Sequence, residues 1–394
     1  MKEGWKIKKI GEVCETGAGG TPLKSHKDYY LNGDIPWLMS GEVSQGEIFK
    51  ANNFITEKGL KNSSARIFPR NTVLVAMYGA TAGQVGILRF EAATNQAVCG
   101  ILPNNSLIPE FLYYYFLFKK DDLITQAVGN AQPNISQLKI KETVVPVPPL
   151  PEQQRIVAIL DQAFAAIAKA KENAEKNLKN ARELFESYLQ GVFERKGKGW
   201  EERRLGEIGK VSMCKRVFKE QTTPLGDIPF YKIGTFGKEP DAYISNDIYI
   251  EFREKYAFPK KGDILISASG TIGRRVRYNG EPAYFQDSNI VWIDNDEIQV
   301  LNDYLYHFYG ACKWNSTKGA TILRLYNDNL KQIKIAFPKS LTEQQTIVRL
   351  LDAMRAETKK LEAIYQQKLV NLEEMTKSIL HKAFAGELET ENKY

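Results

Sequence analysis

The chain has 394 residues, of which 43% are hydrophobic and 26% are charged, and its formal net charge is +7. A length of this order predicts two or three domains, and the composition is that of an ordinary globular protein, which excludes disorder over a whole domain. The mild basic excess permits nucleic-acid binding without requiring it, and the scattered Cys14, Cys99, Cys214 and Cys312 predict neither a disulfide framework nor a zinc site.

The sequence carries no sign of a membrane or a secretory destination. Its first residues, MKEGWKIKKIGE, contain no apolar stretch of the kind found in secretory signals. The longest apolar and aromatic run covers 111–118 and is too short to cross a membrane. We therefore expect a protein of the reducing cytoplasm without a membrane partner.

The chain is an internal duplication. Segments of the first half return in the same order at an offset of about 190 to 195 residues. The clearest pairs are GWKIKKIGE (4–12) with GWEERRLGE (199–207), DIPW (34–37) with DIPF (227–230), TN (94–95) with SN (288–289), FLYY (111–114) with YLYH (304–307), and PEQQRIV (151–157) with TEQQTIV (342–348). We expect two copies of one structural unit, related by a pseudo-two-fold axis.

Each copy begins with a region of short apolar runs separated by turn residues. Runs such as 73–76, 264–266 and 290–293 predict strands, and helices are expected near 109–120 and 302–312. The globular regions, 1–148 and 199–338, are therefore predicted to have an α+β fold with a strand-rich core. The aromatic run 113–118 is interpreted as core rather than as a platform for stacking bases.

A long helix follows each globular region, over 149–195 and 341–386. Pro151 and Glu152 mark the first start, and no Pro or Gly then occurs until Gly191. Apolar residues alternate at spacings of four and three, which predicts a coiled-coil seam. The predicted seam comprises Ile156, Leu160, Ala163, Ile167, Ala170, Ala174, Ile347, Leu351, Met354, Leu361, Leu372, Met375 and Ile379, with Asn177, Thr358 and Lys368 as polar interruptions that fix the register.

The two helices are expected to pair with each other. Each would run about 40 residues, or about 60 Å at 1.5 Å per residue. Short connections favour an antiparallel arrangement inside one chain, so that the two long antiparallel helices would separate the two globular domains as a rigid spacer.

Sequence motifs for catalysis are missing. The chain contains no GxxxxGK[ST], no HExxH, no GxSxG and no paired His and carboxylate cluster. An enzyme needs an acid–base or nucleophile constellation, and none can be assembled here. We therefore expect a non-catalytic protein without a bound metal or cofactor.

The tandem of globular region and long helix resembles the specificity subunit of type I restriction-modification systems. The resemblance covers essentially the whole chain and is carried by VPVPPLPEQQRI (145–156), FPKSLTEQQ (337–345), LQGVF (189–193), LHKAFAGEL (380–388), GGTP (19–22) and GTIG (270–273). One departure is that CKRV (214–217) stands in the second copy where GGTP stands in the first. Equivalent loops of the two copies are therefore not expected to contact DNA alike.

That resemblance implies a function. Each globular region would be a target recognition domain that reads one half of a split, asymmetric sequence in double-stranded DNA, while the helices set the gap. Two modification (methyltransferase) subunits would bind and methylate adenine at N6, and restriction/translocase subunits would join them. S-adenosylmethionine, ATP and Mg would then belong to the partner subunits.

Specific reading of DNA needs donors and acceptors for base edges on loops, with Lys and Arg on phosphates. Polar and basic residues that follow predicted strands or lie in Gly-rich and basic loops meet this need, and the repeat offset predicts that Lys219 corresponds to Lys24. The candidates are Thr21, Lys24, Ser25, Lys27, Tyr78, Thr81, Gln84, Gln132, Asn134, Lys215, Arg216, Lys219, Ser267, Ser269, Arg274, Arg275, Arg324 and Asn327. Asn95, Gln96 and Asn289 could equally satisfy buried backbone groups.

Two other readings stay open at this level. In one, the coiled coil mediates assembly and the globular regions bind protein, without specific reading of DNA. In the other, the chain is an endonuclease with an unrecognised site. DNA binding that weakens with salt favours recognition of DNA over the adaptor, and metal-dependent cleavage without partners would indicate the nuclease.

Overall fold

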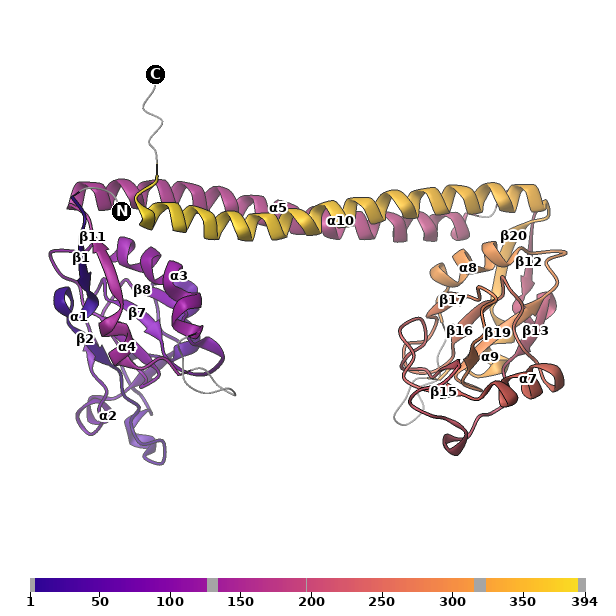
Figure 1. Cartoon of the computed structure of the whole chain (residues 1–394), viewed down its shortest axis with the longest axis horizontal. Helices are drawn as coiled ribbons and strands as arrows, with labels where there is room; N and C mark the ends of the chain where they lie inside the picture. Colours follow the sequence, from indigo (N-terminus) through magenta and orange to yellow (C-terminus); the bar gives the residue numbers. More distant parts are fainter. Residues whose placement is uncertain (1–3, 126–133, 196, 315–323, 389–394) are drawn as a thin grey trace, which may run out of the picture. The chain divides into compact units, whose positions relative to one another are not determined.

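The computed structural model describes residues 4–125, 134–195, 197–314 and 324–388 (Figure 1). It divides into two compact units: unit 1 comprises 1–174 and 367–394, and unit 2 comprises 175–366. Each unit contains one globular domain and a half of each of two 45-residue helices, α5 (Leu150–Glu194) and α10 (Leu341–Ala385). In the described ranges no helix has both the length and the apolar character needed to cross a membrane.

Unit 1 is organised around a five-stranded sheet of order β2-β10-β7-β8-β4. A four-stranded sheet, β5-β3-β9-β6, and a two-stranded sheet, β1-β11, complete it. The strands are β1 (Lys6–Lys9), β2 (Thr16–Ala18), β3 (Ile35–Leu38), β4 (Gly46–Ile48), β5 (Asn53–Ile55), β6 (Ile67–Phe68), β7 (Val73–Ala76), β8 (Val85–Leu88), β9 (Ala92–Thr94), β10 (Val98–Ile101) and β11 (Val144–Val147). The helices are α1 (Ile10–Val13), α2 (Glu57–Lys61), α3 (Pro109–Thr125) and α4 (Gln137–Glu142), with 3₁₀ turns η1 (Lys27–Tyr29), η2 (Ser40–Gln45) and η3 (Gly79–Thr81).

Unit 2 repeats this plan with fewer strands. Its sheets are β13-β19-β16-β17, β15-β14-β18 and β12-β20. The strands are β12 (Trp200–Arg204), β13 (Gly209–Ser212), β14 (Ile228–Tyr231), β15 (Tyr243–Ile244), β16 (Ile264–Ser267), β17 (Arg275–Arg277), β18 (Tyr284–Phe285), β19 (Ile290–Asn295) and β20 (Lys334–Pro338). The helices are α6 (Leu205–Ile208), α7 (Asn246–Lys255), α8 (Asn302–Ala311) and α9 (Asn327–Gln332), with the 3₁₀ turn η4 (Lys219–Gln221). The strands and helices expected from the apolar runs are confirmed.

The central sheets are apolar on both faces, because alternate residues of a strand point to opposite sides. In unit 1, Val73 and Val75 of β7 pack in the core beneath α3, whereas Leu74 and Ala76 belong to a second core on the opposite face. In unit 2, Ile264 and Ile266 of β16 pack toward α8, and Leu265 packs on the other side. Each sheet therefore has one face toward the helices and one face toward the smaller sheet.

The aromatic run of α3 belongs to the core, as expected. Tyr114, Tyr115 and Phe116 are buried. The far end of α10 completes the same core, since Phe384 packs against Phe111 and Tyr115 with ring centroids 5.3 and 5.0 Å apart. The core of unit 1 thus combines residues from both ends of the chain.

A buried glutamine attaches each long helix to its domain. Gln153, the middle residue of the first Glu-Gln-Gln motif, donates to the carbonyls of Ser106 (2.7 Å) and Pro148 (2.8 Å) and accepts from the N–H of Ile108 (2.9 Å). Gln344 makes the corresponding bonds to Gln299 (2.8 Å), Pro338 (2.8 Å) and Leu301 (2.9 Å). Neither glutamine is exposed to solvent. One amide therefore satisfies three buried backbone groups at each junction.

A second repeated contact differs in chemistry between the units. The Tyr114 hydroxyl donates to Asp161 on α5 at 2.6 Å, whereas His307 Nε2 lies 2.9 Å from Asp352 on α10. The His307 side chain is fully buried. Burial lowers its pKa below the ordinary value, and the opposing effect of Asp352 is smaller.

The helices pair antiparallel within each unit. In unit 2, Arg182 contacts Glu362 at 3.3 Å while Phe185 lies 6.0 Å from the Arg355 guanidinium, so α5 and α10 run in opposite directions. One row of the predicted seam is buried or half-buried, including Leu160, Ile167, Ala174, Leu351, Thr358 and Leu372.

The second row of the predicted seam is wrong in part of its length, because the inward row lies one residue further along each helix. Leu361 and Met375 are 38% and 52% exposed, and Glu362 and Thr376 are the half-buried residues beside them. Ala163, Ala170, Ile347, Met354 and Ile379 are half-buried, and Ile156 is buried. Asn177 and Lys368 are exposed and interrupt nothing, and the Thr358 hydroxyl bonds to carbonyls of its own helix.

We expect Gln153→Leu to destabilise unit 1 by about 2–4 kcal/mol, because three buried backbone groups would lose their partner. Urea unfolding followed by tryptophan fluorescence measures the change. Gln154→Leu, at the exposed neighbouring position, is the matched control and should stay within about 0.5 kcal/mol of wild type. Equal midpoints for the two variants would contradict this role of the amide.

Unit 2 should lose stability as pH falls from 7 to 5. The lowered pKa of His307 means that the unfolded chain binds a proton, below about pH 6.5, that the folded chain resists. His307→Tyr, which copies the tyrosine of unit 1, should reduce the difference between the unfolding midpoints at the two pH values. The same difference in both proteins would refute the assignment to His307.

Candidate nucleic-acid interface

The loop 19–27 of unit 1 has a rigid base. The N–H groups of Gly19 and Gly20 donate to the carbonyls of Val98 (3.0 Å) and Thr94 (2.9 Å), and Trp37 Nε1 donates to the Gly20 carbonyl at 3.0 Å. A Cβ on Gly20 would lie 2.2 Å from the backbone nitrogen of Ala65. The glycines are therefore required by close packing of the backbone, and the loop beyond them starts from a fixed position.

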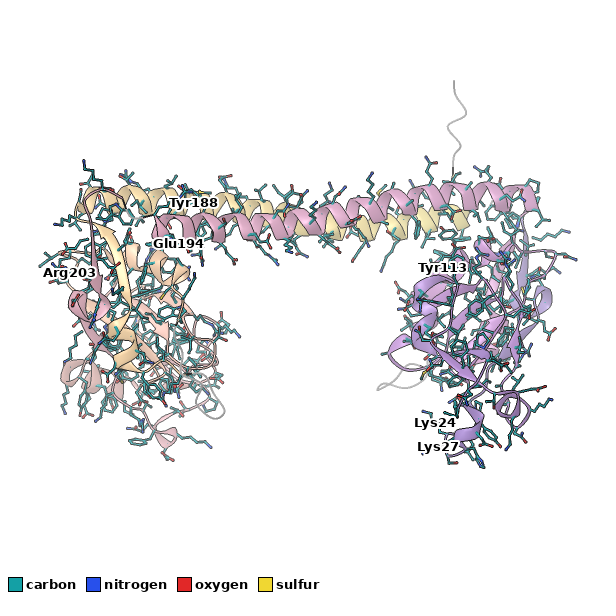
Figure 2. All side chains as sticks on the ribbon, turned by 180° about the vertical axis from the view of Figure 1, so that it is seen from behind. Lys24, Lys27, Tyr113, Tyr188, Glu194 and Arg203 are labelled. Carbon is teal, nitrogen blue, oxygen red and sulfur yellow. The ribbon has the colours of Figure 1, made fainter. Side chains whose placement is uncertain are left out.

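The tip of this loop presents free cations. Leu23, Lys24, Ser25 and Lys27 are exposed, and Figure 2 places Lys24 and Lys27 at the end of unit 1 farthest from the long helices. Within the described ranges neither lysine pairs with a carboxylate. The neighbouring Asp28 is instead paired with Lys58, whose hydrogen bond lowers the pKa of that carboxyl group. Thr21 differs from the lysines, because its hydroxyl donates to Gln96.

The corresponding loop of unit 2 is more basic and partly engaged. Lys215 lies 4.8 Å from the centre of the Tyr256 ring, and Arg216 pairs with Asp287 at 2.9 Å. Lys219 is exposed and begins η4. Its structural counterpart is Lys27, the first residue of η1, so the alignment of Lys219 with Lys24 is wrong: the loop of unit 2 is shorter.

A second set of candidates follows β7 and β16. Isolated bridges pair Tyr78 with Asn134 and Ser269 with Arg324. Gly79, Gly83, Gly270 and Gly273 adopt positive φ values of 69°, 77°, 65° and 83°. Such positive φ values favour glycine, and the turns differ in length, since the two glycines are four residues apart in unit 1 and three apart in unit 2. In unit 1 Tyr78 and Asn134 are exposed, Thr81 and Gln84 are half-buried, and the Thr81 hydroxyl contacts the Tyr78 carbonyl at 3.3 Å.

In unit 2 this turn draws several candidates inward, and the expectation of a surface contact is wrong for its two serines. Ser267 is buried, donates to the Thr271 carbonyl at 2.6 Å and accepts from the Arg274 N–H at 2.8 Å. Ser269 is buried and donates to Asn289 at 2.7 Å. The Arg274 guanidinium bonds the Phe236 carbonyl at 3.0 Å. These side chains close the turn because backbone groups within it need partners.

Arg275 is directed inward as well, toward α8: a Cβ on Gly310 would lie 2.4 Å from its Nη2. It belongs to the helix side of the sheet and not to a loop that could reach a base. Arg324 bonds the Ser288 hydroxyl at 3.1 Å and is half-buried, and Asn327 begins α9. Gln132 lies outside the described residues.

The strand pairing also corrects one pair of the sequence repeat. Thr94 ends β9 opposite Leu38 of β3, and Phe285 ends β18 opposite Tyr231 of β14. Thr94 and Phe285 are therefore equivalent, and the alignment of 94–95 with 288–289 is wrong because unit 2 has one additional residue in this turn.

Exposed apolar side chains beside the basic loops were missed by the sequence reasoning. Leu23, Leu31, Phe218, Leu225 and Tyr326 are all more than half exposed. Apolar contacts of this kind can read the methyl group of thymine or enter a base step. The only sequence signal was the position of Leu23 and Phe218 next to Lys24 and Lys219, since hydropathy alone assigns such residues to a core.

Among the described residues, neither a metal site nor an activated thiol is found. No group of three His, Cys, Asp or Glu side chains among them could hold a metal ion. Burial raises the pKa of Cys14 to about 11 and that of Cys99, Cys214 and Cys312 to about 12, so these thiols are poor nucleophiles.

Comparison with known proteins gives the family. The model of the type I restriction modification DNA specificity domain matches twice, over residues 2–177 and 197–370. The chain belongs to the type I restriction-modification specificity subunits. It is 49% identical over 246 residues to a putative type I restriction enzyme specificity subunit of Haemophilus influenzae, an alignment that covers 61% of this chain and 63% of that relative.

Other relatives extend over nearly the whole specificity subunit. This chain is 28% identical to the MjaIX specificity subunit of Methanocaldococcus jannaschii, in an alignment that covers 98% of this chain and 94% of that relative. Among solved structures, one that describes the complex assembly and conformational transition of the type I R-M system contains a chain that matches with TM-score 0.81 at 20% identity. The match covers 98% of this chain and 99% of that one. The HsdS subunit from Thermoanaerobacter tengcongensis matches with TM-score 0.64 at 20% identity, covering 98% of each. These two structures establish a shared fold.

The loop geometry predicts a phosphate-type contribution from Lys24 and Lys27. We expect the double change Lys24→Ala and Lys27→Ala, in the assembled complex, to weaken binding to target and unrelated DNA alike. The slope of log K against log salt should fall by about one for each phosphate that the variant no longer neutralises. Lys6→Ala with Lys8→Ala, exposed on β1 of the same unit, is the charge-matched control. An unchanged slope in the loop variant would exclude these lysines from the interface.

Proposed function

We propose that this specificity subunit reads a bipartite, asymmetric DNA target, one half with each globular domain, and that α5 and α10 set the gap between the halves. Two modification subunits would bind the chain and methylate adenine at N6, and restriction/translocase subunits would use the same recognition for cleavage. The complex would work in the cytoplasm. The observation that carries the proposal is the repeated specificity domain, in which each copy holds its own basic loop.

The difference between the two loops supports an asymmetric target. In unit 1 the tip carries Lys24 and Lys27 beside Leu23, whereas in unit 2 a shorter loop carries Lys219 beside Phe218. Base edges are read by the donors, acceptors and apolar groups that a loop presents. Two loops that present different groups should select different half-sites.

The chemistry would belong to the partners. Methylation of adenine in a duplex requires the base to be turned out of the stack into an enzyme pocket. This chain would supply position, by fixing the partner's pocket over one base of each half-site. S-adenosylmethionine, ATP and Mg would bind to the modification and restriction subunits.

Methylome sequencing of a host that co-expresses this chain with its modification subunit tests the proposal. We expect a new split motif with methyladenine in both halves. Exchange of residues 1–148 for those of another specificity subunit should change one half and leave the other and the gap intact. A soluble complex that adds no methylation would overturn the proposal, and a salt titration of its DNA binding would then tell an inactive reader from an adaptor.

A further inference from the structure

Unit 2 carries three arginines around one tyrosine on the helix side of its central sheet. Arg275 and Arg277 alternate along β17 with Val276, which packs in the core of the opposite face. The guanidinium carbons of Arg275 and Arg277 lie 4.7 and 5.1 Å from the centre of the Tyr306 ring on α8. Arg355 of α10 lies 5.4 Å from the same ring and donates to the Tyr306 hydroxyl at 2.8 Å.

Two of these arginines lack an anionic partner among the described residues. Asp303 pairs with Arg277 at 2.7 Å, and Asp352 is bound to His307. Arg275 and Arg355 therefore have only aromatic rings and the phenol as partners. The Arg275 Nε is buried and has no hydrogen-bond acceptor, a rare condition that calls for an explanation. Burial and the nearby Arg355 both lower the pKa of Arg275.

The fold itself does not require this charge. By strand register, Arg275 and Arg277 correspond to Val85 and Ile87 of β8 in unit 1. Tyr306 directly precedes His307, as Tyr113 precedes Tyr114, and Arg355 follows Asp352 by three residues, as Phe164 follows Asp161. Tyr306 therefore corresponds to Tyr113, and Arg355 to Phe164. At these three positions unit 1 therefore has apolar side chains where unit 2 has arginines.

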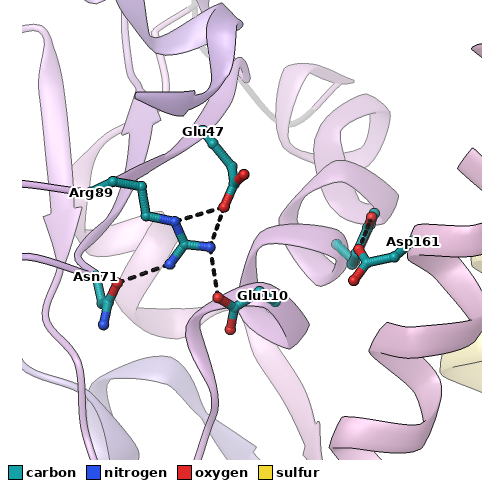
Figure 3. A network of polar contacts seen from close by, with 6 residues as sticks. Glu47, Asn71, Arg89, Glu110 and Asp161 are labelled. Atoms are coloured by element: carbon teal, nitrogen blue, oxygen red, sulfur yellow. Dashed lines mark hydrogen bonds and ion pairs between the residues drawn. The ribbon is translucent and has the colours of Figure 1, made fainter. Parts of the chain in front are cut away.

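Unit 1 instead lines this place with carboxylates. Arg89 there is bonded to Glu47, Glu110 (2.6 Å) and Asn71 (2.8 Å), and Asp161 lies nearby on α5 (Figure 3). These residues border a cavity of about 930 Å³ between the domain and the helix, lined also by Tyr113 and Tyr114. Three carboxylates against one guanidinium leave a net negative charge at the junction of unit 1.

We propose that Arg275 and Arg355 form a receptor for a carboxylate side chain of a protein partner, the modification subunit of the proposed complex. The proposal rests on the proposed function for the identity of that partner. A guanidinium presents parallel donors that match the two oxygens of a carboxylate, and the stacked rings hold the arginines in place before the partner arrives. The receptor exists in unit 2 alone, because unit 1 has Val85 and Phe164 at the same positions.

A protein carboxylate fits this site better than a DNA phosphate. Arg275 lies against Gly310 of α8 and is half-buried, unlike the exposed lysines of the basic loops. The basic loop with Lys215 contacts Tyr256 and Tyr284, on the opposite side of the sheet.

The test compares assembly of the full chain with its modification subunit, measured by mass photometry over a range of salt concentrations. Arg275→Gln and Arg355→Gln should each weaken association by about 10- to 100-fold and reduce its salt dependence. Arg355→Lys, which keeps the charge and loses the fork, should fall between them and wild type. Arg349→Gln, exposed on the same helix and bonded only within it, is the charge-matched control and should assemble normally.

The outcomes separate this inference from the proposed function. If the wild-type chain binds the modification subunit and both glutamine variants bind it equally well, the carboxylate receptor is overturned and the proposed function stands. Normal assembly with a reduced salt slope of DNA binding would also overturn it, in favour of a phosphate contact. Failure of the wild-type chain to bind the modification subunit would overturn the proposed function itself. Thermal unfolding of each variant identifies a weakened association that comes from misfolding. If a glutamine variant is misfolded, the association of Arg355→Lys with the modification subunit decides whether the receptor proposal holds.

Discussion

The buried side-chain amide at the start of each long helix is the contact on which the rest of the structure depends. Gln153 and Gln344 each satisfy one N–H and two carbonyls, and these groups belong to the segment before a domain helix and to the strand end that leads into the long helix. A hydrophobic residue of similar size would leave all three unpaired in a place that water does not reach. The direction in which each long helix leaves its domain therefore follows from the shape and polarity of one side chain.

Around this shared frame the two units diverge where a ligand could contact them. The turns after β7 and β16 both use two glycines at positive φ and an isolated bridge, and the side chains that these turns present are different. The junction between sheet and helix diverges further, with carboxylates in unit 1 and arginines in unit 2. The two copies share the buried amide at the start of each long helix and differ in the side chains of the turns and of the junction between sheet and helix.

Much of the fold could be read from the sequence, and the reasons for the failures are physical. Apolar runs bounded by turn residues located β7, β16 and β19, because strands buried on both faces must be apolar throughout. One row of the helix seam was right and the other was displaced by one residue, because the inward row contains Arg355, Glu362 and Thr376, which hydropathy places outside. The candidate site was harder to predict, since Ser267 and Arg275 are residue types typical of DNA contacts. They differ from Lys24 in the direction in which the side chain points. Direction depends on which backbone groups nearby need partners, and the sequence does not display it.

The core of unit 1 has a consequence for synthesis on the ribosome. Phe384 and its neighbours Leu380 and Ala383 close the cluster around Phe111 and Tyr115, and they are translated more than 260 residues after that pair. Unit 2, by contrast, is one continuous stretch of chain. The apolar core of nascent unit 1 therefore stays exposed while unit 2 is synthesised and folds. During this period a chaperone can bind the exposed apolar surface. The domain that emerges first is the last to be completed.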